Sequence, residues 1–232
     1  MKRLEIKEER ELSGVMRDTF RRIKINTEFS GQGQKSICIT SSTSNEGKTT
    51  VAIGLAKAFA EEEGKKVLLV DADIRKSCMN LRLGYDSDSK GLTEYITGKS
   101  DANDVIYKTS IDGFYLTPAG RMTNNSTQLF KRDSFAEFIK EVEEAFDMVI
   151  IDTPPLGLLV DAAIIAALSD ACLLVVGSNM VSRKDVKKNV MELKKANENF
   201  LGVILNKTKE EADGYNRKYY HNYSAYNKEE KK

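Results

Sequence analysis

Five short apolar runs are the feature that most constrains the fold of this 232-residue chain. They are SICIT (36–40), VLLVDAD (67–73), MVIIDTPP (148–155), ACLLVVGS (171–178) and LGVILNK (201–207). Each holds a continuous apolar stretch rather than apolar residues at alternate positions, and each ends in polar residues. Strands of this kind are typical of a parallel sheet that is covered by helices on both faces.

Helical patterns separate these runs. Residues 48–62 carry apolar residues near helical spacing, and Gly64 offers a stop. Residues 134–146 place five apolar residues on one face, and Ser134 is a candidate N-cap. Alternation of strands and helices predicts an α/β fold with a doubly wound, mostly parallel sheet flanked by helices.

Three further elements complete the prediction. Residues 183–196 are expected to form a Lys-rich helix with Val186, Val190 and Leu193 facing inward. Between residues 79 and 125 the pattern is weaker, and we expect a helix near 91–107 and a strand at 113–118. We expect one domain over residues 1–208, which includes an N-terminal helical segment at about 10–30.

The composition excludes several classes of protein. The chain is 41% hydrophobic and 31% charged with a net charge of +1, which fits a globular domain and gives no case for nucleic-acid binding. Three cysteines without a pairing pattern predict reduced thiols in the cytosol. The charged N-terminus MKRLEIKEERELSG is not a signal peptide, and no apolar run approaches the roughly 18 residues of a membrane-spanning helix.

The first apolar run leads into STSNEGKTT, which aligns with the phosphate-binding loop motif G-x-x-x-x-G-K-[ST]. Backbone N–H groups of such a loop surround phosphates, its lysine neutralises the β- and γ-phosphates, and its Ser/Thr hydroxyl binds Mg²⁺. Here Ser42 replaces the first glycine. The predicted phosphate-binding residues are therefore Ser42, Thr43, Ser44, Asn45, Glu46, Gly47, Lys48, Thr49 and Thr50.

Carboxylates follow two of the other runs. Asp152 ends the third run, where it is placed to serve the Mg²⁺ shell together with Thr49. Asp71 and Asp73 end the second run, and a spacing of two residues points both side chains the same way in an extended segment. We expect these carboxylates to serve a metal ion and a hydroxyl nucleophile beside the phosphate loop.

The C-terminal residues 209–232 are rich in tyrosine and poor in aliphatic residues. They contain five of the nine tyrosines of the chain, namely Tyr215, Tyr219, Tyr220, Tyr223 and Tyr226. A segment with so little to bury predicts a flexible tail outside the core, or a segment that folds on a partner. His221, the only histidine, has no neighbouring cysteine and makes a poor metal site.

Taken together, STSNEGKTT, VLLVDADIR, MVIIDTPP, LGVILNK and the tyrosine-rich end resemble the bacterial tyrosine kinases. The resemblance is to the cytoplasmic kinases of Gram-positive capsular and exopolysaccharide systems. It implies ATP- and Mg²⁺-dependent autophosphorylation of the five tail tyrosines, in trans within an oligomer. It further implies catalytic roles for Lys48, Asp71 and Asp73, with Asp71 accepting the tyrosine proton or orienting the tyrosine oxygen. It also implies metal binding by Thr49, Asp73 and Asp152, and contact of Asn206 with adenine.

The same resemblance implies partners. These are a separate membrane-anchored activator of the polysaccharide co-polymerase type, further copies of the chain in a possible ring, and a cognate tyrosine phosphatase. The kinase would then be cytoplasmic and peripheral at the inner face of the cell membrane. Asp18, Arg21 and Lys24 align with a Glu-x-x-Arg-x-x-Arg pattern that makes subunit contacts, although lysine lacks the bidentate fork of arginine. Ser77 and Cys78 stand where the family often has proline after the basic pair.

Two alternative functions stay open. A partitioning or septum-positioning ATPase has the same kind of fold but usually carries an additional lysine near the start of the loop, where this chain has Ser42 and Thr43. Such a switch also leaves the tyrosine-rich tail unexplained. The second alternative is a nucleotide-sensing scaffold without catalysis, which the complete set of loop and carboxylate residues argues against.

Overall fold

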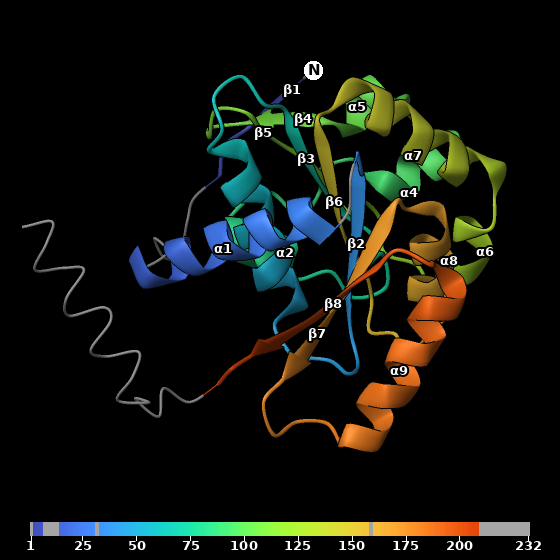
Figure 1. The fold of residues 1–232 in the computed structure, drawn as a ribbon. Coiled ribbons are helices and arrows are strands. Elements are labelled where there is room, and N and C mark those ends of the chain that lie inside the picture. The colour runs from blue at the N-terminus through green and yellow to red at the C-terminus, as the bar shows by residue number, and fades with distance from the viewer. Residues whose placement is uncertain (1, 7–13, 31–32, 158–159, 209–232) are drawn as a thin grey trace, which may run out of the picture.

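The structure, a computed structural model, describes residues 2–6, 14–30, 33–157 and 160–208. Within these ranges the chain forms one eight-stranded sheet with helices on both faces (Figure 1). None of the helices in the described ranges is long and apolar enough to cross a membrane. The predicted tail, residues 209–232, lies outside the described residues.

The sheet is parallel at every strand pair but one. Its strands are β1 (Lys2–Leu4), β2 (Ser36–Ser41), β3 (Val67–Asp71), β4 (Tyr107–Thr109), β5 (Phe114–Thr117), β6 (Met148–Asp152), β7 (Ala171–Gly177) and β8 (Phe200–Asn206). Their order is β1-β4-β5-β3-β6-β2-β7-β8, and only β4 and β5 run antiparallel to each other. This arrangement confirms the predicted doubly wound, mostly parallel sheet.

The central strands bury both of their faces, which explains their continuous apolar sequences. In β3, Leu68 and Val70 belong to one hydrophobic cluster, whereas Val67 and Leu69 belong to the other. The strands β6 and β7 divide their side chains between the two clusters in the same alternating way. Each cluster is one face of the sheet, closed by its own layer of helices.

The helices are α1 (Gly14–Ser30), α2 (Lys48–Ala60), α3 (Met79–Leu83), α4 (Leu92–Ile96), α5 (Ala102–Val105), α6 (Ser126–Phe130), α7 (Asp133–Ala145), α8 (Asp161–Leu168) and α9 (Arg183–Ala196). Residues of α1, α2 and α3 join one cluster, and residues of α4 to α9 join the other. The helix α1 lies on α2 so closely that a Cβ at Gly54 would stand 2.3 Å from the ring of Phe20. Only glycine permits this approach.

The long predicted helices are confirmed with small changes at their ends. The helix α2 ends at Ala60, four residues before Gly64, and α9 has the predicted bounds. In α7 the predicted apolar face is buried, but Ser134 is not the N-cap. The cap position is Arg132, and the Ser134 hydroxyl instead donates to the carbonyl of Ile96 at 3.0 Å.

The expected helix at 91–107 is wrong. The chain forms α4, turns, forms α5 and then enters β4. The N–H groups of Gly98 and Lys99 donate to the carbonyls of Tyr95 and Glu94, and such bonds close a helix end. The expected strand at 113–118 is confirmed as β5, whereas β1 was not predicted, because three residues next to a charged stretch carry no strand signal.

Candidate active site

Four strands deliver the predicted site residues to one edge of the sheet. The strand β2 leads into the phosphate loop and α2, β3 ends at Asp71, β6 ends at Asp152 and β8 ends at Asn206. Asp71 and Asp152 are register partners across β3 and β6. Because the carboxyl ends of parallel strands meet at the same edge, residues distant in sequence become neighbours there.

The loop from Ser42 to Gly47 is a tight curve with two left-handed positions. Asn45 has φ 65° and Gly47 has φ 92°, a conformation that favours glycine. A Cβ at Gly47 would stand 2.1 Å from Nδ2 of Asn206, which donates to the carbonyl of Glu46 at 2.9 Å. Asn206 is thus fastened to the loop, beside the place where the resemblance puts the adenine.

Glu46 holds the loop from inside. Its side chain is fully buried, and one carboxylate oxygen accepts the N–H of Thr43 at 2.6 Å. The other accepts the N–H of Gly177, at the end of β7, at 2.9 Å. The sequence pointed to Glu46 only through its place in the motif. The carboxylate itself faces the fold, so Glu46 offers the loop exterior only its backbone, while Ser44 and Asn45 are exposed.

The amino group of Lys48 lies among acidic oxygens. Its Nζ is 3.2 Å from Oδ2 of Asp73, 3.5 Å from Oδ1 of Asp152 and 3.5 Å from Oγ1 of Thr49. Burial alone would lower the pKa of Lys48, but the charges of Asp152, Asp73 and Asp71 outweigh it and raise the pKa above its ordinary value. The ammonium group therefore stays charged, as a phosphate-binding lysine must.

Asp71 is buried and doubly hydrogen-bonded. Its Oδ1 accepts the N–H of Asp73 at 3.1 Å, and its Oδ2 accepts the hydroxyl of Ser77. Burial, followed by the charge of Asp152, raises the pKa of Asp71 to about 8, against the opposing hydrogen bond from Ser77. Ser77 was noted in the sequence only as a departure from the family pattern. In the fold it takes a direct part in positioning Asp71, which proline could not do.

The oxygens near Lys48 fit a magnesium ion. Oδ1 of Asp152 is buried and has no hydrogen-bond partner, although it pairs electrostatically with Lys48. Burial raises the pKa of Asp152, and Lys48 opposes this. Thr49, Asp73 and Asp152 offer the hard oxygen ligands that Mg²⁺ prefers, with phosphates and water completing the shell. Among the described residues, no group of three or more His, Cys, Asp or Glu side chains is placed to hold a metal ion by itself.

A further buried carboxylate, that of Asp161, holds the segment that follows Asp73 in place. Asp161, at the start of α8, is fully buried and accepts hydrogen bonds from Ser126, Thr127 and Nε of Arg75, the last at 3.2 Å. Arg75 also donates to the Ser126 hydroxyl at 2.5 Å. Arg75, the pair Ser126 and Thr127, and Asp161 come from three separate parts of the chain, so no local sequence pattern predicts this network.

The predicted subunit-contact residues are engaged within the chain. Nε of Arg21 lies 2.7 Å from Glu61, and its Nη1 lies 3.5 Å from Asp18. Nζ of Lys24 lies 2.8 Å from Glu62 and over the ring of Phe59. The pairs with Glu61 and Glu62 join α1 to the end of α2, whereas the pair with Asp18 lies within α1. The contact with a neighbouring copy stays a prediction.

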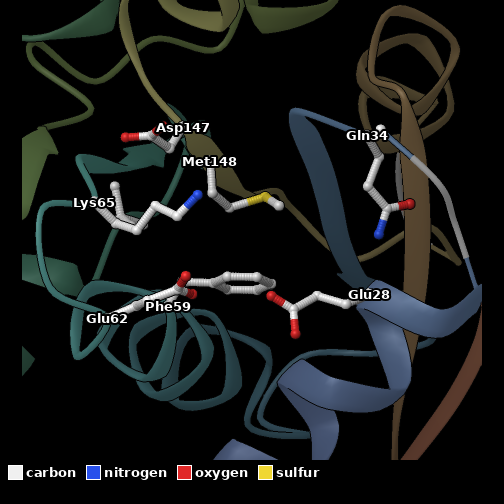
Figure 2. Close-up of a pocket in the computed structure, with 9 residues that line it drawn as sticks. Glu28, Gln34, Phe59, Glu62, Lys65, Asp147 and Met148 are labelled. Atoms are coloured by element: carbon white, nitrogen blue, oxygen red, sulfur yellow. The ribbon is translucent and has the colours of Figure 1, made fainter.

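Two hollows lie at opposite edges of the sheet, one beside the phosphate loop and one far from it. One of about 450 Å³ adjoins the start of the phosphate loop, between Ser42, Gly157 and α9, and the buried hydroxyl of Ser42 has no partner. The other, of about 380 Å³, opens where β3 and β6 begin, and Figure 2 shows Phe59 and Met148 among its walls. None of the predicted site residues lines this second hollow, since it lies at the far edge of the sheet.

The fold and the loop define the class, a P-loop nucleotide-binding domain, and comparisons with known proteins agree. A sequence profile of the AAA domain matches residues 34–207. The solved kinase domain of the Escherichia coli tyrosine kinase ETK has a TM-score of 0.79 and 29% identity, over 85% of this chain and 77% of that one. The septum site-determining protein MinD complexed with Mg-ADP, from Pyrococcus horikoshii, has a TM-score of 0.64 and 32% identity, over 74% and 69%.

The curated relatives narrow the class. Tyrosine-protein kinase CpsD of Streptococcus agalactiae is 38% identical over 213 residues, which are 92% of this chain and 90% of the relative. The chain therefore belongs to the bacterial tyrosine kinases of the Gram-positive type, and it is a protein-tyrosine kinase. This confirms the resemblance drawn from the motifs and decides against the ATPase switch and the inactive scaffold as its class.

Proposed function

We propose that this kinase transfers the γ-phosphoryl group of ATP to Tyr215, Tyr219, Tyr220, Tyr223 and Tyr226, in trans between copies of the chain. The observation that carries the proposal is the convergence of Lys48, Thr49, Asp71, Asp73 and Asp152 at one edge of the sheet. The chain continues toward the tyrosines from β8, whose last residue is bonded to the phosphate loop at this same edge. Asn206, nine residues before Tyr215 in the sequence, therefore lies at the phosphate loop.

Each group has a role in the transfer. The loop N–H groups and Lys48 bind the phosphates, and Lys48 gives up its carboxylate partners for phosphate oxygens as they bind. The tyrosine oxygen forms a bond to the γ-phosphorus, the bond from that phosphorus to the β,γ-bridging oxygen breaks, and ADP leaves. Asp71 accepts the phenolic proton in its ionised form, which the binding of Mg²⁺ nearby would favour over the protonated form that its pKa of about 8 gives without metal. The pKa of the phenol is about 10 in free tyrosine. Thr49, Asp73 and Asp152 would hold Mg²⁺, which would neutralise the phosphate charge.

The setting we propose follows the family resemblance. A membrane-anchored activator of the polysaccharide co-polymerase type binds the kinase and holds it at the inner face of the membrane. A cognate phosphatase removes the phosphates, and the cycle regulates capsular or exopolysaccharide synthesis and export. The presence of Lys48, Thr49, Asp71, Asp73, Asp152 and Asn206 at their motif positions supports the same use of the fold.

Intact-mass spectrometry of the protein with Mg²⁺-ATP tests the proposal, with and without the activator's cytoplasmic segment. We expect stepwise phosphate gain in the wild type, and none in the Lys48→Met variant or in a variant with the five tail tyrosines changed to Phe. A folded Lys48→Met protein with full activity would overturn the mechanism. Turnover of ATP without mass gain in the presence of the activator would instead support an ATPase switch.

A further inference from the structure

One face of α9 carries a dense array of positive charge. At roughly 100° per residue, six basic residues fall within about 140° of the helix circumference. They are Arg183, Lys184, Lys187, Lys188, Lys194 and Lys195, here called the basic face, and all six are exposed. Met191 lies in the middle of this arc with 60% of its surface exposed.

The basic face makes few interactions with the rest of the described fold. In the described part of the chain, none of its six cations forms an ion pair, and only Lys194 has an aromatic partner, the ring of Phe200 at 5.9 Å. The opposite face of α9 packs onto the sheet through Val186, Val190 and Leu193. Concentrating like charges on one helix face costs stability, so the array is better explained by an anionic partner than by folding.

The face has a shape as well as a charge. Arg183, Lys184, Lys187 and Lys188 surround Met191 and border an open hollow of about 440 Å³. Guanidinium and ammonium donors make short, strong hydrogen bonds to phosphate oxygens. The thioether of methionine makes favourable contacts with aromatic rings. Cations around a methionine therefore suit a phosphate carried on an aromatic ring better than a bare phosphate.

The chain itself contains a ligand of this chemistry. Its residues 209–232 hold six basic and five acidic residues, a formal charge of +1, which the basic face repels. Five phosphotyrosines would add roughly −8 to −10 and reverse the sign. The segment also starts close by, since the N–H of Ser178 donates to the carbonyl of Asn206 at 2.8 Å and Ser182 caps α9 four residues later.

We propose that the basic face of α9 is a phosphotyrosine docking surface, and that its occupant is the phosphorylated form of residues 209–232, from the same chain or a second copy. The proposal rests on the proposed function, because it requires that the tail be phosphorylated. Docking withdraws the modified tail from the active-site edge, whereas the unmodified tail, with its positive charge, stays available as substrate. Phosphorylation thus moves the tail from the active site to the basic face of α9.

A synthetic peptide of residues 209–232 tests the docking surface without any need for kinase activity. The peptide is labelled and made both with five phosphotyrosines and without phosphate. Its binding to the full chain, with the five tail tyrosines changed to Phe, is followed by fluorescence anisotropy. We expect the phosphorylated peptide to bind at least about tenfold more tightly than the other, and added salt to weaken it.

Charge reversals locate the site. We expect Lys184→Glu, Lys187→Glu and Lys188→Glu together to weaken phosphopeptide binding by about tenfold or more, since each reversal replaces an attraction by a repulsion. The matched control reverses three exposed lysines elsewhere, Lys99, Lys108 and Lys131, and should leave binding within about twofold. Because the peptide arrives already phosphorylated, a failure of autophosphorylation cannot mimic a failure of docking.

Two results would overturn the proposal. The first is equal phosphopeptide binding by the α9 and control variants, which would place the site elsewhere or reduce it to net charge. The second is binding to phosphatidylglycerol vesicles that the α9 reversals abolish, with no preference for the phosphorylated peptide. That result would make the basic face a membrane-binding surface instead.

Discussion

Replacing Glu46 by Gln tests whether the phosphate loop is held from inside the fold. The buried carboxylate bridges the N–H of Thr43, at 2.6 Å, and the N–H of Gly177, at 2.9 Å. Glutamine has nearly the same shape but only one accepting oxygen. If that oxygen keeps the buried Gly177 bond, the amide NH₂ must face the N–H of Thr43, donor against donor, and the loop must shift.

The expected cost follows from these two bonds. Loss of one charge-assisted bond costs about 1.5–3 kcal/mol, and the surviving bond to Gly177 becomes a weaker neutral one. Thr43 is half-buried, so water can partly satisfy its N–H, and removing a buried charge gives some stability back. We expect Glu46→Gln to lower the free energy of unfolding by about 2 kcal/mol, which a domain of ordinary stability survives.

Urea unfolding followed by far-UV circular dichroism measures this difference, with Glu63→Gln, at an exposed position, as the control. We also expect weaker binding of Mg²⁺-ADP by Glu46→Gln, because the loop that presents the backbone N–H groups loses its internal fastening. A change of less than about 0.5 kcal/mol with unchanged nucleotide affinity would refute the reasoning, since surface substitutions have effects of that size.

Three further substitutions probe other parts of the fold. Gly47→Ala places a methyl group 2.1 Å from Nδ2 of Asn206, at a residue whose φ is 92°. We expect the free energy of unfolding to fall by about 1–3 kcal/mol and the affinity for ADP to fall as well, both measured by thermal shift with and without Mg²⁺-ADP. The pKa of Asp71 is about 8 in the folded protein and about 4 in the unfolded chain, so between these pH values the folded state binds one more proton. In metal-free protein the free energy of unfolding should therefore fall as the pH rises from about 4 to about 8, by at most about 1.4 kcal/mol per pH unit. Urea titrations from pH 5 to 8 should show this slope reduced in Asp71→Asn; equal slopes would contradict it. Phe138→Ala removes a fully buried ring that packs on Tyr95 with centroids 5.0 Å apart, and should cost about 3–5 kcal/mol in the same assay; a much smaller cost would mean that the site collapses around the lost ring.

The elements that were predictable are those whose signal is local. The buried strands announce themselves through continuous apolar runs, and α9 through three inward residues at helical spacing. Short elements were not predictable in this way. The helix α8 has the sequence DAAIIAAL, which is apolar all round and shows no periodicity, and α3 and α6 have five residues each.

In the candidate site, too, the features with a local sequence signal were predictable and the others were not. The phosphate loop and the carboxylates at strand ends follow from motif and spacing, because β2, β3 and β6 are parallel and end together. The hydrogen bonds that orient these groups join residues far apart in the chain, such as Glu46 with Gly177 and Arg75 with Asp161. Ser77 was visible as an unusual residue, but its bond to Asp71 depends on how the chain turns after β3.

The bond between Asn206 and the phosphate loop fixes the point from which every tail tyrosine is tethered. Tyr215 lies nine residues beyond Asn206 and Tyr226 lies twenty, so their farthest reach from that point is about 30 Å and 70 Å respectively. The length of chain between Asn206 and a tyrosine also sets the effective concentration of that tyrosine at an active site. This concentration is near zero when the linker is too short to reach the site, is highest when its length matches the distance, and falls as the linker becomes longer. If copies of the chain phosphorylate one another's tails as proposed, the tyrosine that is phosphorylated first would report how far one copy's active site lies from Asn206 of its neighbour.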